Sequence, residues 1–238
     1  MGRNKMIVVS DFALSFMWVC SGVLLKSFIK KNISFNHSHM VEIVKIGFSI
    51  ANMFFYAFLA KVFRGGTNNP LATLVDAISG DFHNFVFCIG SRIPVQVIGY
   101  IVGVKLLTDI IPGIGHGPRL NVDIYRGALT EGLLTFTIVV ITLGITATKI
   151  RRSFFMKTWI SSIMKLILHK LGSNLTGGCM NPASVMGWAF ARGDHISKEH
   201  LLVYWLAPIK ATLLAVWIFK FLVRHVKKDK MSSKNKSD

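Results

Sequence analysis

The sequence GGCMNPA at residues 177–183 repeats, with changes, an earlier stretch that reads GGTNNPL at residues 65–71. Each stretch opens on a glycine pair and reaches an Asn-Pro box, after which a short apolar segment begins. These segments, at about residues 69–79 and 181–191, are too short to cross a bilayer, which takes about 20 residues of helix. Two matched boxes of this kind indicate an internal repeat with an interrupted segment in each half.

Longer apolar runs surround the two boxes, at residues 7–29, 41–62, 84–107, 126–148, 155–172 and 201–223. Hydrophobic residues make up 52% of the 238 positions and charged residues 16%, so runs of this length indicate membrane spans rather than a soluble core. The sequence therefore predicts an all-α membrane protein with six transmembrane helices and two re-entrant half-helices, in contact with membrane lipid.

The predicted spans form one domain over residues 1–238, with repeat halves at about 1–115 and 120–225. Residues 226–238 are expected to be a disordered basic tail. Because each half carries three spans, an odd number, the halves must insert with opposite orientation. Each half also carries an acid early in its first span, Asp11 in one and Glu131 in the other. Inverted repeats with interrupted segments at matching positions predict a substrate site near the bilayer midplane.

The net charge of +17 would suggest nucleic acid in a soluble protein, but here the basic residues lie between and beyond the spans. They gather before the first span and after the second, fourth and sixth, chiefly at Arg3, Lys5, Lys61, Arg64, Lys149, Arg151, Arg152, Lys157 and the tail lysines. These positions share one face, which the positive-inside rule makes cytosolic together with both termini. No aromatic residues are interleaved with these charges as in nucleic-acid sites, and the three cysteines have no metal or disulfide spacing. We expect no nucleic-acid partner, metal or cofactor.

An Asn-Pro pair is a common start for a helix. The side-chain oxygen of Asn69 or Asn181 can accept a bond from a first-turn N–H, and the fixed φ of Pro70 or Pro182 suits the next position. Each side chain would then have its NH₂ group free to donate into a lumen. The helix N-termini carry about half a positive charge each, which disfavours protons and other cations but lets a neutral molecule pass. The alternative is that each box is simply a helix start at a loop.

Two further motifs accompany the boxes, QVIG at residues 96–99 and YWLAP at residues 204–208. With them, the sequence resembles the major intrinsic protein (aquaporin) family across nearly its whole length. Its basic charge and the Asn-Pro-Leu box ending at Leu71 resemble the second subgroup of plant small basic intrinsic proteins, while Ala183 in the second box is the usual residue. The resemblance implies a homotetramer with one pore per subunit, located in the endoplasmic reticulum membrane.

The resemblance also implies a selectivity filter on the non-cytosolic side of the boxes, formed by Ser49, His169, Gly178 and Ser184. Most aquaporins carry arginine at the position of Ser184, so the filter is expected to be wider and less cationic than in a strict water channel. A neutral imidazole at His169 would offer a solute both a donor and an acceptor, and its titration would make flux depend on pH. The alternatives for His169 are a core histidine with its hydrogen bonds satisfied and a histidine near a helix end that reaches interfacial water.

The two acids differ in their expected surroundings. A buried carboxylate at Glu131 needs partners, and the backbone N–H groups of the loop beside a half-helix are suitable. In the family the corresponding acid braces that loop. Asp11 lies close enough to the start of its span to be solvated. The first non-cytosolic loop carries two glycosylation sequons, at Asn32 and Asn36.

The sequence favours a passive channel for water or a small neutral solute. Hydrogen peroxide and glycerol are alternative permeants because of Ser184 and Gly178. A secondary transporter would need a substrate or ion charge site, which the boxes do not provide. A non-conducting structural protein would keep the fold with its pore closed by Leu71. No nucleophile–base pair, metal cluster or phosphate-binding loop is visible, so no enzyme activity is expected.

Overall fold

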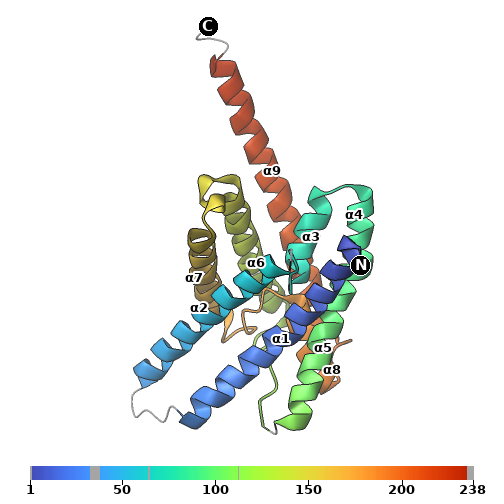
Figure 1. The fold of residues 1–238 in the computed structure, drawn as a ribbon, viewed down its shortest axis with the longest axis vertical. Helices are drawn as coiled ribbons and strands as arrows, with labels where there is room; N and C mark the ends of the chain where they lie inside the picture. Colours follow the sequence, from blue (N-terminus) through green and yellow to red (C-terminus); the bar gives the residue numbers. More distant parts are fainter. Residues whose placement is uncertain (1, 33–37, 64, 112, 235–238) are drawn as a thin grey trace.

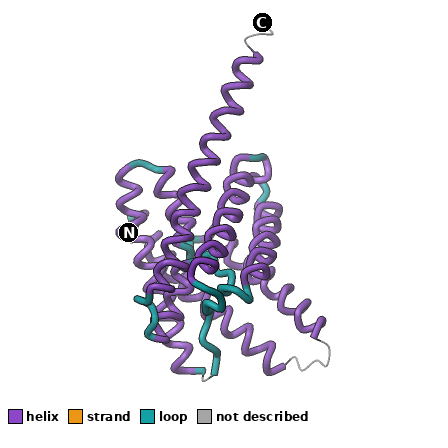
Figure 2. Tube along the Cα trace, turned by 180° about the vertical axis from the view of Figure 1, so that it is seen from behind, coloured by secondary structure: helices purple, strands orange, loops and turns teal. Residues whose placement is uncertain are grey.

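The computed structural model describes residues 2–32, 38–63, 65–111 and 113–234, which form helices and loops with no strand (Figure 2). The first half contains α1 (Arg3–Asn32), α2 (Ser38–Val62), the half-helix α3 (Pro70–Ser79), α4 (Phe82–Phe87), the π-helical turn η1 (Cys88–Arg92) and α5 (Ile93–Ile110). The second half contains α6 (Ile124–Ala147), the 3-10 turn η2 (Lys149–Arg152), α7 (Phe154–Gly172), the half-helix α8 (Pro182–Arg192), the π-helical segment η3 (His200–Leu206) and α9 (Ala207–Lys234).

Five helical stretches within the described residues are long and apolar enough to cross a membrane: Arg3–Ile29, Met40–Val62, Phe82–Ile110, Ile124–Ala147 and His200–Val223. The remaining expected span, the fifth in chain order at 155–172, is the 19-residue helix α7. It is less apolar because Lys157, Lys165 and Lys170 lie along it. Because α7 packs against α2 and α6, it is part of the helix bundle together with the five apolar spans, despite its lysines.

The inverted repeat is visible in the helix packing (Figure 1). The two most extensive helix contacts are α1 with α5 in the first half and α6 with α9 in the second, which are equivalent pairs. The half-helices cross between the halves, since α3 packs on α9 and α8 packs on α5. Each half therefore completes the other, and the two Asn-Pro boxes are brought to one place in the middle of the bundle.

A π-helical turn interrupts the last span of each half. The N–H of Ile93 bonds to the Cys88 carbonyl, and the N–H of Ala207 bonds to the Leu202 carbonyl, five residues back in both cases. A proline follows directly, Pro94 in one helix and Pro208 in the other. Because proline has no N–H to donate, the preceding turn can widen without losing a regular bond at that position. This matched feature was not predicted from the sequence.

The predicted disordered tail is wrong over most of its length, because α9 continues to Lys234 and extends beyond the bundle (Figure 1). Lysine and arginine are good helix formers, so a basic segment can prolong a span into water. The last four residues lie outside the described part of the chain. The sequon at Asn36 also lies outside it, and that at Asn32 does so apart from Asn32 itself, the last residue of α1.

Candidate functional site

Both box asparagines cap their half-helices, the arrangement expected from the sequence. The Asn69 side-chain oxygen accepts a bond of 2.9 Å from the backbone N–H of Leu71, at the start of α3. The Asn181 oxygen accepts one of 3.3 Å from the N–H of Ser184, at the start of α8. Pro70 and Pro182 occupy the first helical positions. Both half-helices thus begin within the bundle with their positive ends inward.

The NH₂ groups of the two caps reach across to the opposite box. Asn69 Nδ2 donates to the carbonyl of Met180 at 2.9 Å, and Asn181 Nδ2 donates to the carbonyl of Asn68 at 3.0 Å. Each acceptor is the residue just before the other asparagine. This reciprocal pair joins the two half-helix N-termini, so the two positive dipole ends meet at one point of the molecule.

Tyr100 on α5 also lies at this junction, and sequence reasoning did not identify it. Its hydroxyl oxygen accepts from Asn181 Nδ2 at 3.1 Å and from Asn68 Nδ2 at 3.2 Å. Asn181 therefore uses both of its amide hydrogens, which contradicts the expectation that its NH₂ group is free for a lumen. Asn69 uses one amide hydrogen, and the other has no protein partner in the described part of the chain. The sequence feature that could have identified Tyr100 is its place as a large polar residue directly after the QVIG motif.

Glu131 supports the loop before the second box. Its carboxylate, 1% exposed, accepts from the Thr176 hydroxyl at 2.6 Å, the Cys179 N–H at 2.9 Å and the Met180 N–H at 3.0 Å. These are the loop N–H partners proposed from the sequence, with the hydroxyl in addition. Because Met180 also accepts from Asn69, the carboxylate fixes a backbone segment that belongs to the junction itself.

Asp11 plays the matching part in the first half, and the expectation that it is solvated is wrong. Its side chain has no exposed surface and accepts from the Thr67 N–H at 2.7 Å, next to the first box. Arg92 Nε donates to it at 2.7 Å, and Gln96 Nε2 at 3.3 Å. The helix begins at Arg3 rather than at residue 7, so Asp11 lies two turns inside it. Arg92 was missed, although an ionised residue inside an apolar run is a signal in itself.

Two of the four predicted filter residues are in direct contact. His169 Nδ1 lies 3.2 Å from the Gly178 carbonyl oxygen. Because a carbonyl only accepts, Nδ1 carries the hydrogen of this bond, and in the neutral ring Nε2 remains as an acceptor. A solute would then meet an acceptor rather than the donor and acceptor expected from the sequence. Gly178 has φ +54°, and a Cβ there would lie 2.6 Å from the His169 carbonyl oxygen, so the position requires glycine.

The other two predicted filter residues are serines with local backbone contacts. The Ser49 hydroxyl donates to the Lys45 carbonyl at 2.8 Å, one turn earlier on α2. Ser184 lies in the first turn of α8 and is half-buried. Neither hydroxyl bonds to His169 or Gly178 in the part of the chain that the structure describes. Ser49 and His169 lie on neighbouring helices, because α2 packs against α7. Between the same two helices, Lys170 Nζ lies 3.4 Å from Glu42 Oε2.

The chain is similar to known proteins along nearly its whole length. The profile of the family described as "Major intrinsic protein" matches residues 3–219. The chain belongs to the major intrinsic protein family. It is 54% identical to "Probable aquaporin SIP2-1" of Arabidopsis thaliana, with all of both chains covered. It is 44% identical to "Aquaporin SIP2-1" of Zea mays over 97% of this chain and 93% of that protein. These similarities confirm the resemblance to the second small basic subgroup.

A solved structure supports the fold independently of sequence. The aquaglyceroporin from Plasmodium falciparum matches with a TM-score of 0.69 at 14% identity, covering 91% of this chain and 95% of that one. The predicted fold class, an all-α membrane protein of the aquaporin type, is confirmed. Proteins of the major intrinsic protein family are channels, so the chain is a multi-pass membrane protein of a channel family.

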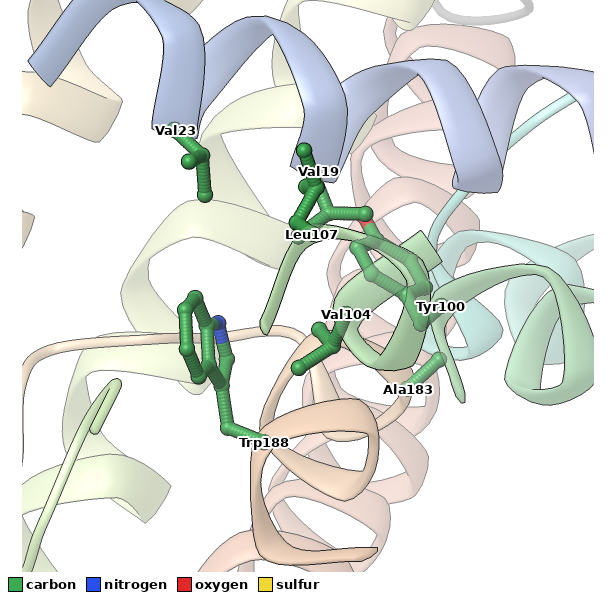
Figure 3. Packing of buried hydrophobic residues seen from close by; sticks show 7 residues of the cluster. All are labelled: Val19, Val23, Tyr100, Val104, Leu107, Ala183 and Trp188. Carbon is green, nitrogen blue, oxygen red and sulfur yellow. The ribbon is translucent and has the colours of Figure 1, made fainter. Parts of the chain in front are cut away.

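The residues that follow the prolines of the two boxes, Leu71 and Ala183, differ in size and are both buried. Leu71, where the second box has Ala183, is 3% exposed, and Ala183 has no exposed surface. The larger side chain is therefore enclosed by protein at the start of α3. Ala183 packs in the same buried cluster as Tyr100 and Trp188 (Figure 3).

Proposed function

We propose that the protein is a passive channel for water and small neutral solutes, with protons and other cations disfavoured at the midplane. The observation that carries this proposal is the reciprocal bonding of Asn69 and Asn181, each a half-helix cap that donates to the loop of the other. Two helix N-termini meet there, and their field opposes a cation. A neutral molecule that accepts hydrogen bonds is not opposed in this way.

Stopped-flow shrinkage of proteoliposomes tests the proposal. We expect water flow faster than through protein-free liposomes of the same lipid, with a lower activation energy, and no added proton leak under a pH gradient. Passage through a preformed pore avoids the partition of water into hydrocarbon, which is why the activation energy falls. Rates equal to those of protein-free liposomes would instead support the non-conducting alternative, and saturable, gradient-coupled uptake would indicate a transporter.

We also propose hydrogen peroxide or glycerol as permeants, because Ser184 and Gly178 occupy the predicted filter. A hydroxyl and a glycine give the filter little bulk and no fixed charge. The hydrogen bond from His169 Nδ1 to the Gly178 carbonyl uses one donor and one acceptor of the predicted filter, so fewer of its polar groups face a solute. Uptake of glycerol and peroxide by the same proteoliposomes tests this second candidate.

Replacing Ser184 with arginine is expected to lower glycerol and peroxide flux by about tenfold, equivalent to about 1.4 kcal/mol of added barrier. The long side chain would narrow the filter and add a fixed positive charge, whereas water is small enough to continue to pass. The matched control is Ser184→Ala, which should leave the ratio of solute to water flux close to that of the wild type. An equal loss of water and solute flux in the arginine variant would mean that position 184 does not select by size.

We further propose a homotetramer in the endoplasmic reticulum membrane with both termini cytosolic, as the subgroup resemblance and the basic face imply. The basic residues at the start of α1, Arg3 and Lys5, and those at the end of α2, Lys61 and Arg64, support this orientation. Protease protection of tags at each terminus in intact microsomes tests the orientation, and chemical cross-linking in the same membranes tests the tetramer.

A further inference from the structure

The two boxes are chemically unequal at the midplane, although they are related by the inverted repeat. Asn181 has both amide hydrogens bonded, to the Asn68 carbonyl and to the Tyr100 hydroxyl. Asn69 has one bonded, to the Met180 carbonyl. Tyr100 causes this inequality, because without its hydroxyl the second amide hydrogen of Asn181 would have no protein partner in the described part of the chain.

Close packing of three helices brings Tyr100 to this place. A Cβ at Gly99 on α5 would lie 2.7 Å from the Phe12 carbonyl oxygen of α1, and a Cβ at Gly187 on α8 would lie 2.9 Å from the Tyr100 carbonyl oxygen. The two glycines therefore let α1 and α8 approach α5 on either side. Figure 3 shows Tyr100 in the space between these helices, with Val19 on one side and Ala183 on the other.

The hydroxyl of Tyr100 acts as a shared acceptor between the two loops. A hydroxyl oxygen has two lone pairs, and both are used, by Asn181 and by Asn68. Tyr100 has no exposed surface, so the oxygen is reached by these two amides and not by an open lumen. The bond to Asn181 thus removes one donor from the set that a permeant molecule could use.

We propose that Tyr100 sets the hydrogen-bonding capacity of the midplane and thereby limits the flow of water. Among the residues that the structure describes, it leaves the second amide hydrogen of Asn69 as the one amide donor of the two caps without a protein partner. This inference rests on the proposed channel function and names a residue that determines its rate. Neutral molecules that accept hydrogen bonds, such as water, are the class affected. An unpaired buried donor is costly, so a donor released by loss of the hydroxyl would be satisfied by an entering water molecule.

Tyr100→Phe isolates the hydroxyl, because the ring that fills the space is kept. We expect osmotic water permeability per protein to rise by about two- to tenfold, the range that one hydrogen bond supplies. The matched control is Tyr204→Phe, which removes the hydroxyl of another buried tyrosine. Tyr204 donates to the Thr176 carbonyl at 2.8 Å and does not touch the cap amides, so its loss should not raise the rate.

A spectroscopic measurement tests the bond itself without any flux. The tyrosine Fermi doublet in ultraviolet Raman spectra distinguishes a phenol oxygen that accepts hydrogen bonds from one that only donates. The difference between the wild-type and Tyr100→Phe spectra, both in the same liposomes, should show the pattern of an acceptor. A donor-only pattern would overturn the proposal, whatever the water flux of the wild type and of the Tyr100→Phe variant.

The flux outcomes separate this proposal from the proposed function. Wild-type flow above that of protein-free liposomes with no increase in Tyr100→Phe overturns the role of Tyr100 and leaves the channel intact. A wild type at the lipid rate with a faster Tyr100→Phe variant supports the role of Tyr100 and overturns conduction by the wild type. If both stay at the lipid rate, both the rate-limiting role and the channel function are overturned.

Discussion

Glu131→Ala is expected to be strongly destabilising, by about 3–5 kcal/mol, and to abolish selective flux. The carboxylate satisfies the Thr176 hydroxyl and two backbone N–H groups of the loop before Asn181, and it is 1% exposed. Alanine leaves these donors buried without an acceptor, and each unsatisfied donor costs about 1–3 kcal/mol. The loop would then lose the geometry that holds the Met180 carbonyl against Asn69.

Thermal unfolding in detergent and water flux in proteoliposomes measure the two effects. The matched control is Glu42→Ala, which removes an exposed carboxylate 3.4 Å from Lys170. An exposed pair of this kind contributes about 0–1 kcal/mol, so the control should unfold close to the wild-type temperature. If the two alanine variants were equally stable, the carboxylate of Glu131 would not be the support of the loop.

A conservative change separates the charge of Glu131 from its shape. Glu131→Gln keeps the length and one acceptor oxygen but places an NH₂ group against backbone N–H donors. It should therefore be nearly as damaging as alanine, because a donor now faces a donor. This outcome would show that the site needs two acceptor oxygens and not simply a side chain of that size.

The parts of this fold that were predictable from the sequence follow from local chemistry. The Asn-Pro boxes specify capped helix starts because a cap uses atoms within three residues of each other. The partners of Glu131 were predictable because an acid within a span must be satisfied, and an interrupted segment has free backbone donors. The span at 155–172 was recognisable in spite of its lysines because its apolar residues recur along its whole length.

The parts that were missed depend on long-range packing. The contacts of Tyr100 with Asn68 and Asn181 join residues 32 and 81 positions away in the sequence, and they require that α1 and α8 approach α5 closely. Asp11 was assigned to the membrane interface because the apolar run begins at residue 7, whereas the helix begins at Arg3 and places the acid deeper. The unequal use of the two cap amides cannot be read from a repeat, because the repeat itself is nearly symmetric.

Arg92→Met is expected to destabilise the first half by about 3–5 kcal/mol, because it leaves the buried Asp11 carboxylate without its counter-charge. Arg92 Nε lies 2.7 Å from Asp11 Oδ2, and the side chains are 7% and 0% exposed. The same guanidinium donates to the Gly65 carbonyl at 3.2 Å, so it also fixes the loop of the first box. Lys170→Met, which breaks an exposed pair, is the control and should have a small effect.

A double-mutant cycle distinguishes the loss of a buried pair from the loss of arginine packing. The double variant Asp11→Asn with Arg92→Met removes both charges, so it should be more stable than Arg92→Met alone when unfolding is followed in the same detergent. The gain arises because an unpaired carboxylate in a dry site costs several kcal/mol, whereas an amide there can still accept from the Thr67 N–H. A double variant whose loss equals the sum of the two single losses would mean that Asp11 and Arg92 act independently. The first box would then be supported by its backbone turn alone, and the functional parallel between Asp11 and Glu131 would fail.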